Sequence, residues 1–171
     1  MTRQSIRNEG EPAEVAFSKA LGEKVKPSDD SRKGDRLFFH QGQWHYVEIK
    51  HCESNTVNQV RAIKCTPLVV FSPDKGKRCW AVLSARLVAK LVANKRRGQH
   101  TEIPFECANL TRSSLHDQVW CTDTELDQRL QAALDDPLNG PIKSVMNELL
   151  AEIKSLCDKY RKRLKSLFSI W

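Results

Sequence analysis

The run Pro67 to Phe71, with the sequence PLVVF, constrains the fold of this chain more than any other feature. Successive side chains of a strand point to opposite faces of a sheet, so a strand without polar positions has to be covered on both faces. A chain of 171 residues, of which 40% are hydrophobic, is long enough to build such a layered core. The run therefore predicts an inner strand with further structure packed on both sides.

Helices and strands are expected on either side of this run. In chain order we expect a helix at 11–21, strands at 36–40 and 44–50, a helix at 55–64, the strand at 67–71, a strand at 80–83, a helix at 85–94 and an edge strand at 103–107. This order predicts an α/β fold, with a mixed β-sheet flanked by helices.

The C-terminal part of the chain has a different pattern. Apolar residues recur at spacings of three and four over 142–168, and lysines and arginines fill the other face. This pattern predicts a long, basic, amphipathic helix that docks on the domain or pairs with a second copy. We therefore expect one domain at 1–135 and a C-terminal helix within 136–171 for docking or oligomerisation.

Composition excludes several classes of protein. The net charge of +7 suits a polyanionic partner, because neutralised phosphates release their counterions. None of the six cysteines forms a CxxC pair, so a zinc ribbon is not expected and the cysteines are interpreted as free thiols in a reducing compartment. The polar start and the lack of a long apolar run argue against secretion and against a membrane span. The expected location is the cytoplasm.

The hairpin expected at 36–50 carries acidic and basic groups at one end. Asp35 directly precedes the apolar strand RLFF, and Glu48 lies near the end of the next strand, so the two carboxylates face each other across the pair. Asp29 and Asp30 also precede the first strand and are alternatives for the first acid. Lys50 lies two residues after Glu48 and shares its face.

The remaining residues of the second strand alternate in the same way. Trp44 and Tyr46 share the face of Glu48, and we expect them to pack beneath the first helix. Ile49 points to the other side, where burial in the core would hold the strand rigid.

Two carboxylates beside an ammonium are the groups that phosphodiester hydrolysis needs. One or two carboxylates suffice to bind Mg²⁺ when water and substrate oxygens complete its shell. A lysine alongside can orient the attacking water or stabilise developing negative charge. Basic residues near this site are predicted to contact the phosphate backbone, namely Arg32, Lys33, Arg36, Arg61 and Lys64.

These residues resemble the PD-(D/E)XK nuclease superfamily, which includes restriction endonucleases and archaeal-type Holliday junction resolvases. The resemblance covers residues 9–84: Asp35, then Glu48-Ile49-Lys50 thirteen positions later, then a helix that bears Gln59. It implies a restriction endonuclease-like core, Asp35 and Glu48 as ligands of Mg²⁺ or Mn²⁺, and Lys50 as the catalytic lysine. In the motif after which the superfamily is named, a proline precedes the first acid, whereas this sequence has Gly34 there.

The resemblance implies two further site residues. Members of the superfamily often carry a metal-binding glutamate on the first helix, and Glu14 fits that place best, with Glu11 and Glu9 as alternatives. Several branches carry a glutamine near the active site on the helix after the lysine, which here is Gln59.

Two functions are compatible with these patterns. The first is a Mg²⁺-dependent DNA endonuclease, with RNA left open as a substrate. Cutting two strands requires two active sites, so a homodimer is expected. The second is a catalytically inactive protein of the same fold that binds DNA or assembles through its basic C-terminal helix.

Overall fold

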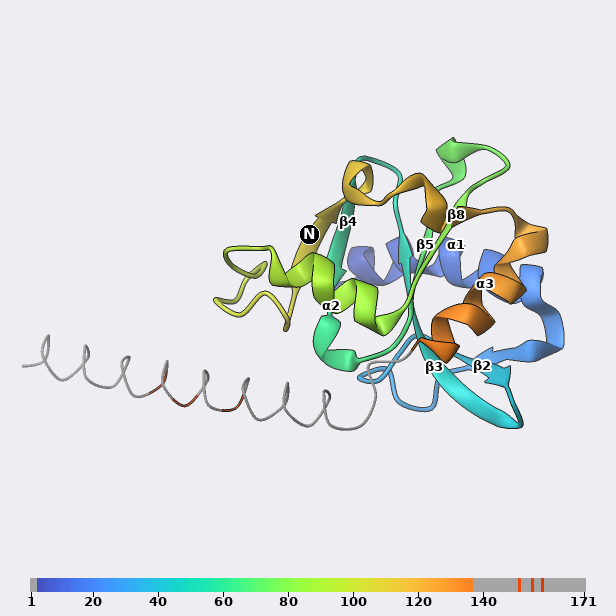
Figure 1. Cartoon of the computed structure of the whole chain (residues 1–171), viewed down its shortest axis with the longest axis horizontal. Helices are drawn as coiled ribbons and strands as arrows, with labels where there is room; N and C mark the ends of the chain where they lie inside the picture. Colours follow the sequence, from blue (N-terminus) through green and yellow to red (C-terminus); the bar gives the residue numbers. More distant parts are fainter. Residues whose placement is uncertain (1–2, 137–150, 152–154, 156–157, 159–171) are drawn as a thin grey trace, which may run out of the picture. The chain divides into compact units, whose positions relative to one another are not determined.

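A mixed sheet of six strands forms the centre of the structure, which is a computed structural model (Figure 1). It describes residues 3–136, 151, 155 and 158, with side chains from residue 12 onwards in the first helix. The strand order is β1-β2-β3-β5-β6-β8, and β3 and β5 are parallel while the other neighbours are antiparallel. The strands are β1 (Val25–Pro27), β2 (Arg36–His40), β3 (Gln43–His51), β5 (Leu68–Phe71), β6 (Trp80–Leu83) and β8 (Trp120–Cys121).

Three α-helices and a two-stranded ribbon cover this sheet. The helices are α1 (Arg3–Leu21), α2 (Ala85–Ala93) and α3 (Asp123–Asp135), and the antiparallel ribbon consists of β4 (Thr56–Val60) and β7 (Ala108–Thr111). Five 3₁₀ turns connect them in the described part: η1 (Gly22–Lys24), η2 (Ala62–Lys64), η3 (Pro73–Lys75), η4 (Arg112–Ser114) and η5 (Asp117–Val119). The α/β fold and the mixed sheet expected from the sequence are confirmed.

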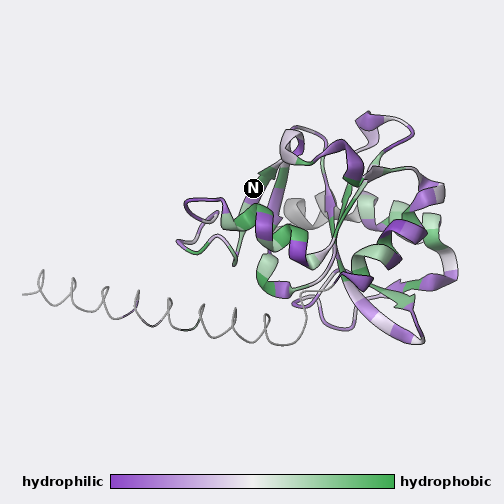
Figure 2. Cartoon of the chain, in the orientation of Figure 1, coloured by the Kyte–Doolittle hydropathy of each residue, from purple (hydrophilic) through white to green (hydrophobic). Residues whose placement is uncertain are grey.

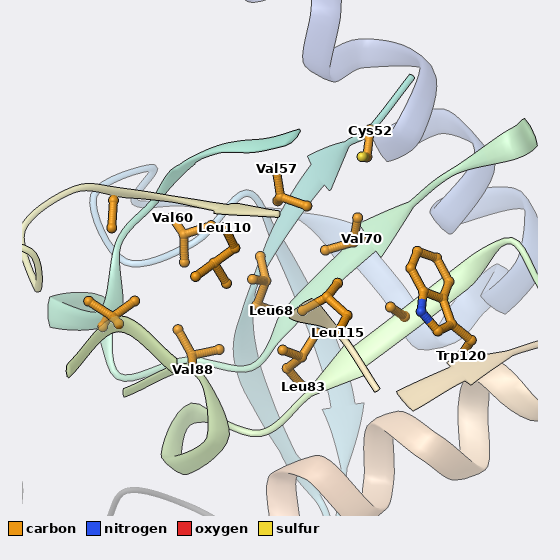
Figure 3. Packing of buried hydrophobic residues seen from close by; sticks show 14 residues of the cluster. Cys52, Val57, Val60, Leu68, Val70, Leu83, Val88, Leu110, Leu115 and Trp120 are labelled. Carbon is orange, nitrogen blue, oxygen red and sulfur yellow. The ribbon is translucent and has the colours of Figure 1, made fainter. Parts of the chain in front are cut away.

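The two faces of the sheet carry separate cores. On one face, α1 and α3 contribute Phe17 and Leu126 to a cluster with Ile49 and Val69. On the other, α2 and the β4–β7 ribbon pack on Leu68, Val70 and Leu83, and Figure 3 shows this second cluster. The run 67–71 therefore alternates between the two cores, as the sequence predicted. Figure 2 shows the resulting division, with hydrophobic residues on the inner strands and hydrophilic ones on the outer loops.

The helix expected at 55–64 is wrong. The segment forms β4 and then η2, and a bulge in β4 shifts the register against β7 between Val57 and Val60. The extra residue of a bulge lets two side chains three positions apart reach the same core. Val57 and Val60 are both buried there, and the pairing with β7 makes this segment a strand.

Two smaller expectations also differ from the structure. Residues 103–107 form turns rather than an edge strand, and the strand β7 begins directly after them at Ala108. Trp44 does not pack beneath α1, because it faces away from that helix and is 39% exposed. The long helix expected at 142–168 lies outside the described residues apart from three single positions, and the last helix of the described domain is α3, with 13 residues.

Neither a disulfide nor a membrane-spanning helix occurs among the described residues. All five cysteines in the described part of the chain are free. No helix among the described residues is long and apolar enough to cross a bilayer.

The core beneath the hairpin can be tested at Ile49, which is 3% exposed between α1 and the sheet. We expect Ile49→Ala to lower the free energy of unfolding by about 2–5 kcal/mol, because it leaves a cavity. Ile63 is 39% exposed and offers a matched control, so Ile63→Ala should cost roughly 0.5 kcal/mol or less. Urea unfolding of both variants measures this, and equal losses would contradict the assignment of Ile49 to the core.

Candidate active site

Asp35 is fixed at the start of β2 by backbone contacts to β3. Its N–H donates to the carbonyl oxygen of Val47 at 2.8 Å, and its carboxylate Oδ2 accepts the N–H of Ile49 at 2.8 Å. Because β2 begins only at Arg36, the carboxylate serves as the acceptor for that N–H. The side chain is therefore held beside the β3 residue that separates Glu48 from Lys50.

Gly34 allows the chain to approach β3 closely at this point. A Cβ atom on Gly34 would lie 2.9 Å from the carbonyl oxygen and 3.0 Å from the nitrogen of Val47. Since both are backbone atoms, any side chain at this position would push the start of β2 away. Glycine in place of the proline of the family name thus has a local steric reason here.

Glu48 and Lys50 lie on one face of β3, as the alternation of the strand predicted. The Lys50 ammonium is 2.7 Å from Oε1 of Glu48 and 3.9 Å from Oδ2 of Asp35. The structure therefore brings the three predicted residues Asp35, Glu48 and Lys50 around one ammonium group. Asp35 and Lys50 are each 22% exposed, so the group is open to solvent on one side.

A second ammonium approaches Glu48 from the other side. Lys64, at the end of η2, is ion-paired with Oε2 of Glu48 and donates to the carbonyl oxygen of Ser31 at 3.2 Å. Its side chain is only 5% exposed. The structure places Lys64 inside the site, whereas the sequence indicated a helix residue that contacts phosphate.

The chain topology explains why Lys64 arrives here. Because β3 and β5 are parallel neighbours, the segment just before β5 returns to the middle of β3, where Pro67 accepts the N–H of Glu48 at 3.0 Å. A parallel pairing of the strands expected at 44–50 and 67–71 is the one signal that could have placed residues before Pro67 beside Glu48. No local spacing connects Lys64 with Glu48.

The two acids have opposite electrostatic environments. Burial alone would raise the pKa of Glu48, but Lys50 and Lys64 outweigh it and hold the pKa below its ordinary value. The pKa of Asp35 is raised by burial and by the charge of Glu48, more than Lys50 lowers it. Glu48 is therefore firmly ionised, whereas the charge of Asp35 is poorly compensated.

Glu14 contacts a different partner from the one implied by the resemblance. Its Oε2 lies 2.6 Å from Nη1 of Arg36, which also donates to the carbonyl oxygen of Asp35 at 3.1 Å. Arg36, predicted to contact phosphate, is 21% exposed and supports the start of β2 from the side of α1. The side chains of Glu9 and Glu11 lie outside the described part of α1.

Gln59 lies on a strand and not on a helix. It sits at the β4 bulge with a φ angle of +55°, and its N–H donates to the side-chain oxygens of Gln99 at 3.2 Å and Asn109 at 3.1 Å. These contacts explain the local backbone and do not connect Gln59 with Asp35, Glu48 or Lys50.

The loop before β2 holds the alternative acids, Asp29 and Asp30, and the basic residues Arg32 and Lys33, whereas Arg61 precedes η2. Arg32 is 88% exposed and binds Asp30 at 2.9 Å, while Lys33 lies 3.9 Å from the same carboxylate. Arg61 is exposed at the start of η2. Asp29 accepts the hydroxyl of Tyr46 at 2.5 Å. Asp35, rather than Asp29 or Asp30, is thus the acid next to Glu48 and Lys50.

The donor set limits the kind of metal site that could form. Within the described residues, no cluster of three or more His, Cys, Asp or Glu side chains is placed to hold a metal ion. A cation here would depend on the two carboxylates, with water or substrate oxygens as its other ligands. No protein family, curated protein or solved structure matches this chain. Its function therefore has to be argued from this geometry.

The poorly compensated charge of Asp35 leads to a stability prediction. In metal-free buffer at neutral pH, Asp35→Asn should raise the free energy of unfolding by roughly 0.5–2 kcal/mol, because it removes a carboxylate whose ionised form the fold disfavours. An asparagine oxygen can still accept the Ile49 N–H. The gain should disappear as the pH falls below about 4, where the wild-type carboxyl is protonated.

Thermal unfolding of wild type and Asp35→Asn across this pH range provides the measurement. Glu48→Gln serves as the contrast, since it removes a carboxylate whose ionised form two lysines stabilise, and it should destabilise the protein at neutral pH. A loss of stability in Asp35→Asn comparable to that in Glu48→Gln would show that Asp35 is not strained.

Proposed function

We propose that this chain is a metal-dependent nuclease that hydrolyses phosphodiester bonds, most simply a DNA endonuclease. One observation carries the proposal: the carboxylates of Asp35 and Glu48 lie around the single ammonium of Lys50 at the end of a hairpin. Two acids and a lysine in this arrangement supply the ligands and the positive charge that phosphodiester hydrolysis requires.

The element order supports a restriction endonuclease-like core. A helix precedes a hairpin that bears the acids, and a crossover leads to a strand parallel to the second hairpin strand, in line with the PD-(D/E)XK resemblance. The crossover here consists of β4 and η2 instead of a helix. This difference changes the source of the residues next to Glu48, and it explains why a second lysine is present.

The residues fit Mg²⁺ or Mn²⁺ as a two-carboxylate site. Glu48 is held ionised, and Asp35 is partly exposed and close to it, so a cation would offset the repulsion between the two carboxylates. A metal ion bound here would lower the pKa of a coordinated water and stabilise charge on the phosphorus. Lys50 would have to release Glu48 in part, because its ammonium occupies Oε1.

The side chains have distinct roles in this proposal. The Lys50 ammonium is 22% exposed and can approach a phosphate oxygen or orient the attacking water. Lys64 is buried and keeps Glu48 ionised and in place, so it is a positioning residue. The Ile49 N–H fixes the orientation of Asp35.

The charge of the chain supports a nucleic acid substrate. The net charge is +7, and Arg32, Lys33 and Arg61 lie on the two segments that also supply Asp35 and Lys64, the loop before β2 and the start of η2. They would contact phosphates and carry no base specificity themselves. DNA is the substrate we propose first, RNA is the alternative, and a homodimer would supply the two sites for cutting both strands.

A specific observation favours the second candidate function, a binding or assembly protein without turnover. Both oxygens of Glu48 already contact lysines, and the two acids and two lysines balance in charge without a metal. Such a site can be a structural network. The two functions therefore differ in whether a divalent ion binds and whether cleavage follows.

Nicking of supercoiled plasmid in Mg²⁺ or Mn²⁺ tests the proposal. We expect Asp35→Ala, Glu48→Ala and Lys50→Ala each to reduce cleavage by at least about 100-fold, since each removes a charge that acts at the phosphate. Lys90→Ala, in the exposed position 90 of α2, is the matched lysine control and should keep wild-type activity.

Calorimetry separates the two candidate functions. A nuclease should bind Mn²⁺ in the wild type and lose that binding in Asp35→Ala. If all these variants nick plasmid equally, the assignment of the site is wrong. Metal-independent DNA binding with no cleavage in any divalent ion would favour the binding protein.

A further inference from the structure

Two large aromatic side chains lie exposed on the hairpin that carries the site. Phe39 is 42% exposed and Trp44 is 39% exposed, and their ring centroids are 5.2 Å apart with an interplanar angle of 56°. They pair across β2 and β3 near the turn, at the end of the hairpin away from the acids. A cross-strand aromatic pair can stabilise a hairpin, and the exposed faces of its rings are also open to a ligand.

These rings lie on the same face of the sheet as the carboxylates. Side chains of β3 alternate, so Trp44 and Tyr46 share the face of Glu48. Trp44 is opposite Phe39 in the register, and side chains of directly paired residues share a face. At ~3.3 Å per residue, Trp44 lies about 13 Å along the strand from Glu48. This face of the hairpin therefore carries the exposed rings at one end and the carboxylates at the other, with Tyr46 and the loop that contacts it in between.

Lysines lie over the rings along this surface. The Lys26 ammonium is 4.1 Å from the ring centroid of Trp44, and the Lys33 ammonium is 5.3 Å from that of Tyr46. Lys26 is exposed, and the Lys33 side chain is 61% exposed. We refer to Lys26, Lys33, Phe39, Trp44 and Tyr46 together as the aromatic strip.

The described acidic residues next to the strip are all paired, with Asp29 and Asp30 beside Tyr46 and with Asp135 of α3 bound by His40 and Gln41 at the turn. Asp29 accepts the Tyr46 hydroxyl, and Asp30 is bound by Arg32 at 2.9 Å and lies 3.9 Å from Lys33. The strip near Trp44 thus presents rings and positive charge. This combination fits a polyanion with flat apolar faces, which is the chemistry of nucleic acid bases linked by phosphates.

We propose that the aromatic strip binds unpaired bases, so that the substrate class of this site is single-stranded nucleic acid or a single-stranded segment at a junction or end. A duplex stacks its bases on one another and cannot present their faces to Trp44 and Phe39, whereas a single strand can. A base that stacks on Trp44 displaces the flexible Lys26 side chain, whose ammonium then lies near the adjacent phosphate. The strand continues over Tyr46 towards Asp35 and Glu48. That the bound strand is the substrate of this site rests on the proposed function. That the strip binds a single strand rests on the strip alone.

Binding without metal tests the strip separately from cleavage. The probes are fluorescently labelled oligothymidylate, oligouridylate and a mixed-sequence duplex of equal length, titrated with the full chain in EDTA. We expect both single strands to bind more tightly than the duplex. Trp44→Ala should weaken single-strand binding about tenfold, with a smaller effect for Phe39→Ala, and leave duplex binding unchanged. Trp44→Phe should retain most of the affinity because it keeps a ring.

Val15→Ala provides the matched control. Val15 is 58% exposed on α1, which covers the opposite face of the sheet, so its removal should not change the affinity for any probe. Circular dichroism checks that the variants are folded, and Trp44 is exposed enough that its removal should not unfold the domain. Unchanged single-strand binding in a folded Trp44→Ala protein overturns the proposal.

The remaining outcomes separate this inference from the proposed function. If Trp44→Ala weakens single-strand binding but no protein cleaves in any divalent ion, the strip stands and the nuclease proposal fails. If plasmid nicking depends on Asp35 but wild type prefers the duplex, the nuclease proposal stands and the strip fails. Light scattering tests whether a second copy of the chain occupies the strip instead. A dimer that Trp44→Ala dissociates, with no change in oligonucleotide affinity, would assign the strip to a second copy and overturn the inference.

Discussion

The buried carboxylate of Glu48 is the constraint on which the rest of the structure depends. A charge that is 4% exposed is stable only when groups of opposite charge are placed against it, and Lys50 and Lys64 supply them from two directions. Lys50 follows from the alternation of β3, but Lys64 requires that the chain leave β3, form β4 and η2, and return beside it. The crossover thus supplies a buried charge partner as well as the apolar side chains of Val57 and Val60. The same lysine holds the carbonyl oxygen of Ser31 and so connects the loop before β2 with the site.

The parts of the fold that could be predicted are those with a regular period or a local spacing. The hairpin, the inner strand at 68–71 and the convergence of Asp35, Glu48 and Lys50 follow from strand alternation and antiparallel pairing, and these rules act over a few residues. The helix expected at 55–64 was wrong because the segment pairs with β7, a strand far along the chain that no local pattern connects with it. Lys64 was misplaced because its partner is 16 positions away and is reached only through the parallel pairing of β3 with β5.

Trp44 shows a different limit of sequence reasoning. Alternation correctly assigned Trp44 and Tyr46 to the face of Glu48, but it could not say which layer covers that face. The ribbon and α2 cover the inner strands β5 and β6, whereas α1 packs on the opposite face of β3. The outer end of the hairpin projects beyond these layers (Figure 1), so the aromatic rings that looked like core residues are exposed. An aromatic residue favours burial, but whether it is buried depends on which layer covers its face of the sheet.

The two acids of the site differ in how well positive charges compensate them. The negative charge of Glu48 is paired with two ammoniums, which keep its carboxylate ionised and in place. Asp35 is held in position by a backbone N–H but lacks a close cation of its own, because the nearest ammonium, 3.9 Å away, already contacts Glu48 at 2.7 Å. The protein thus keeps a carboxylate in place at a cost that protonation or an additional positive charge would relieve. Asparagine would make the same backbone hydrogen bond without the charge, so the Ile49 N–H alone does not require an aspartate at this position. In the metal site proposed above, the same carboxylate would gain a cation as its partner.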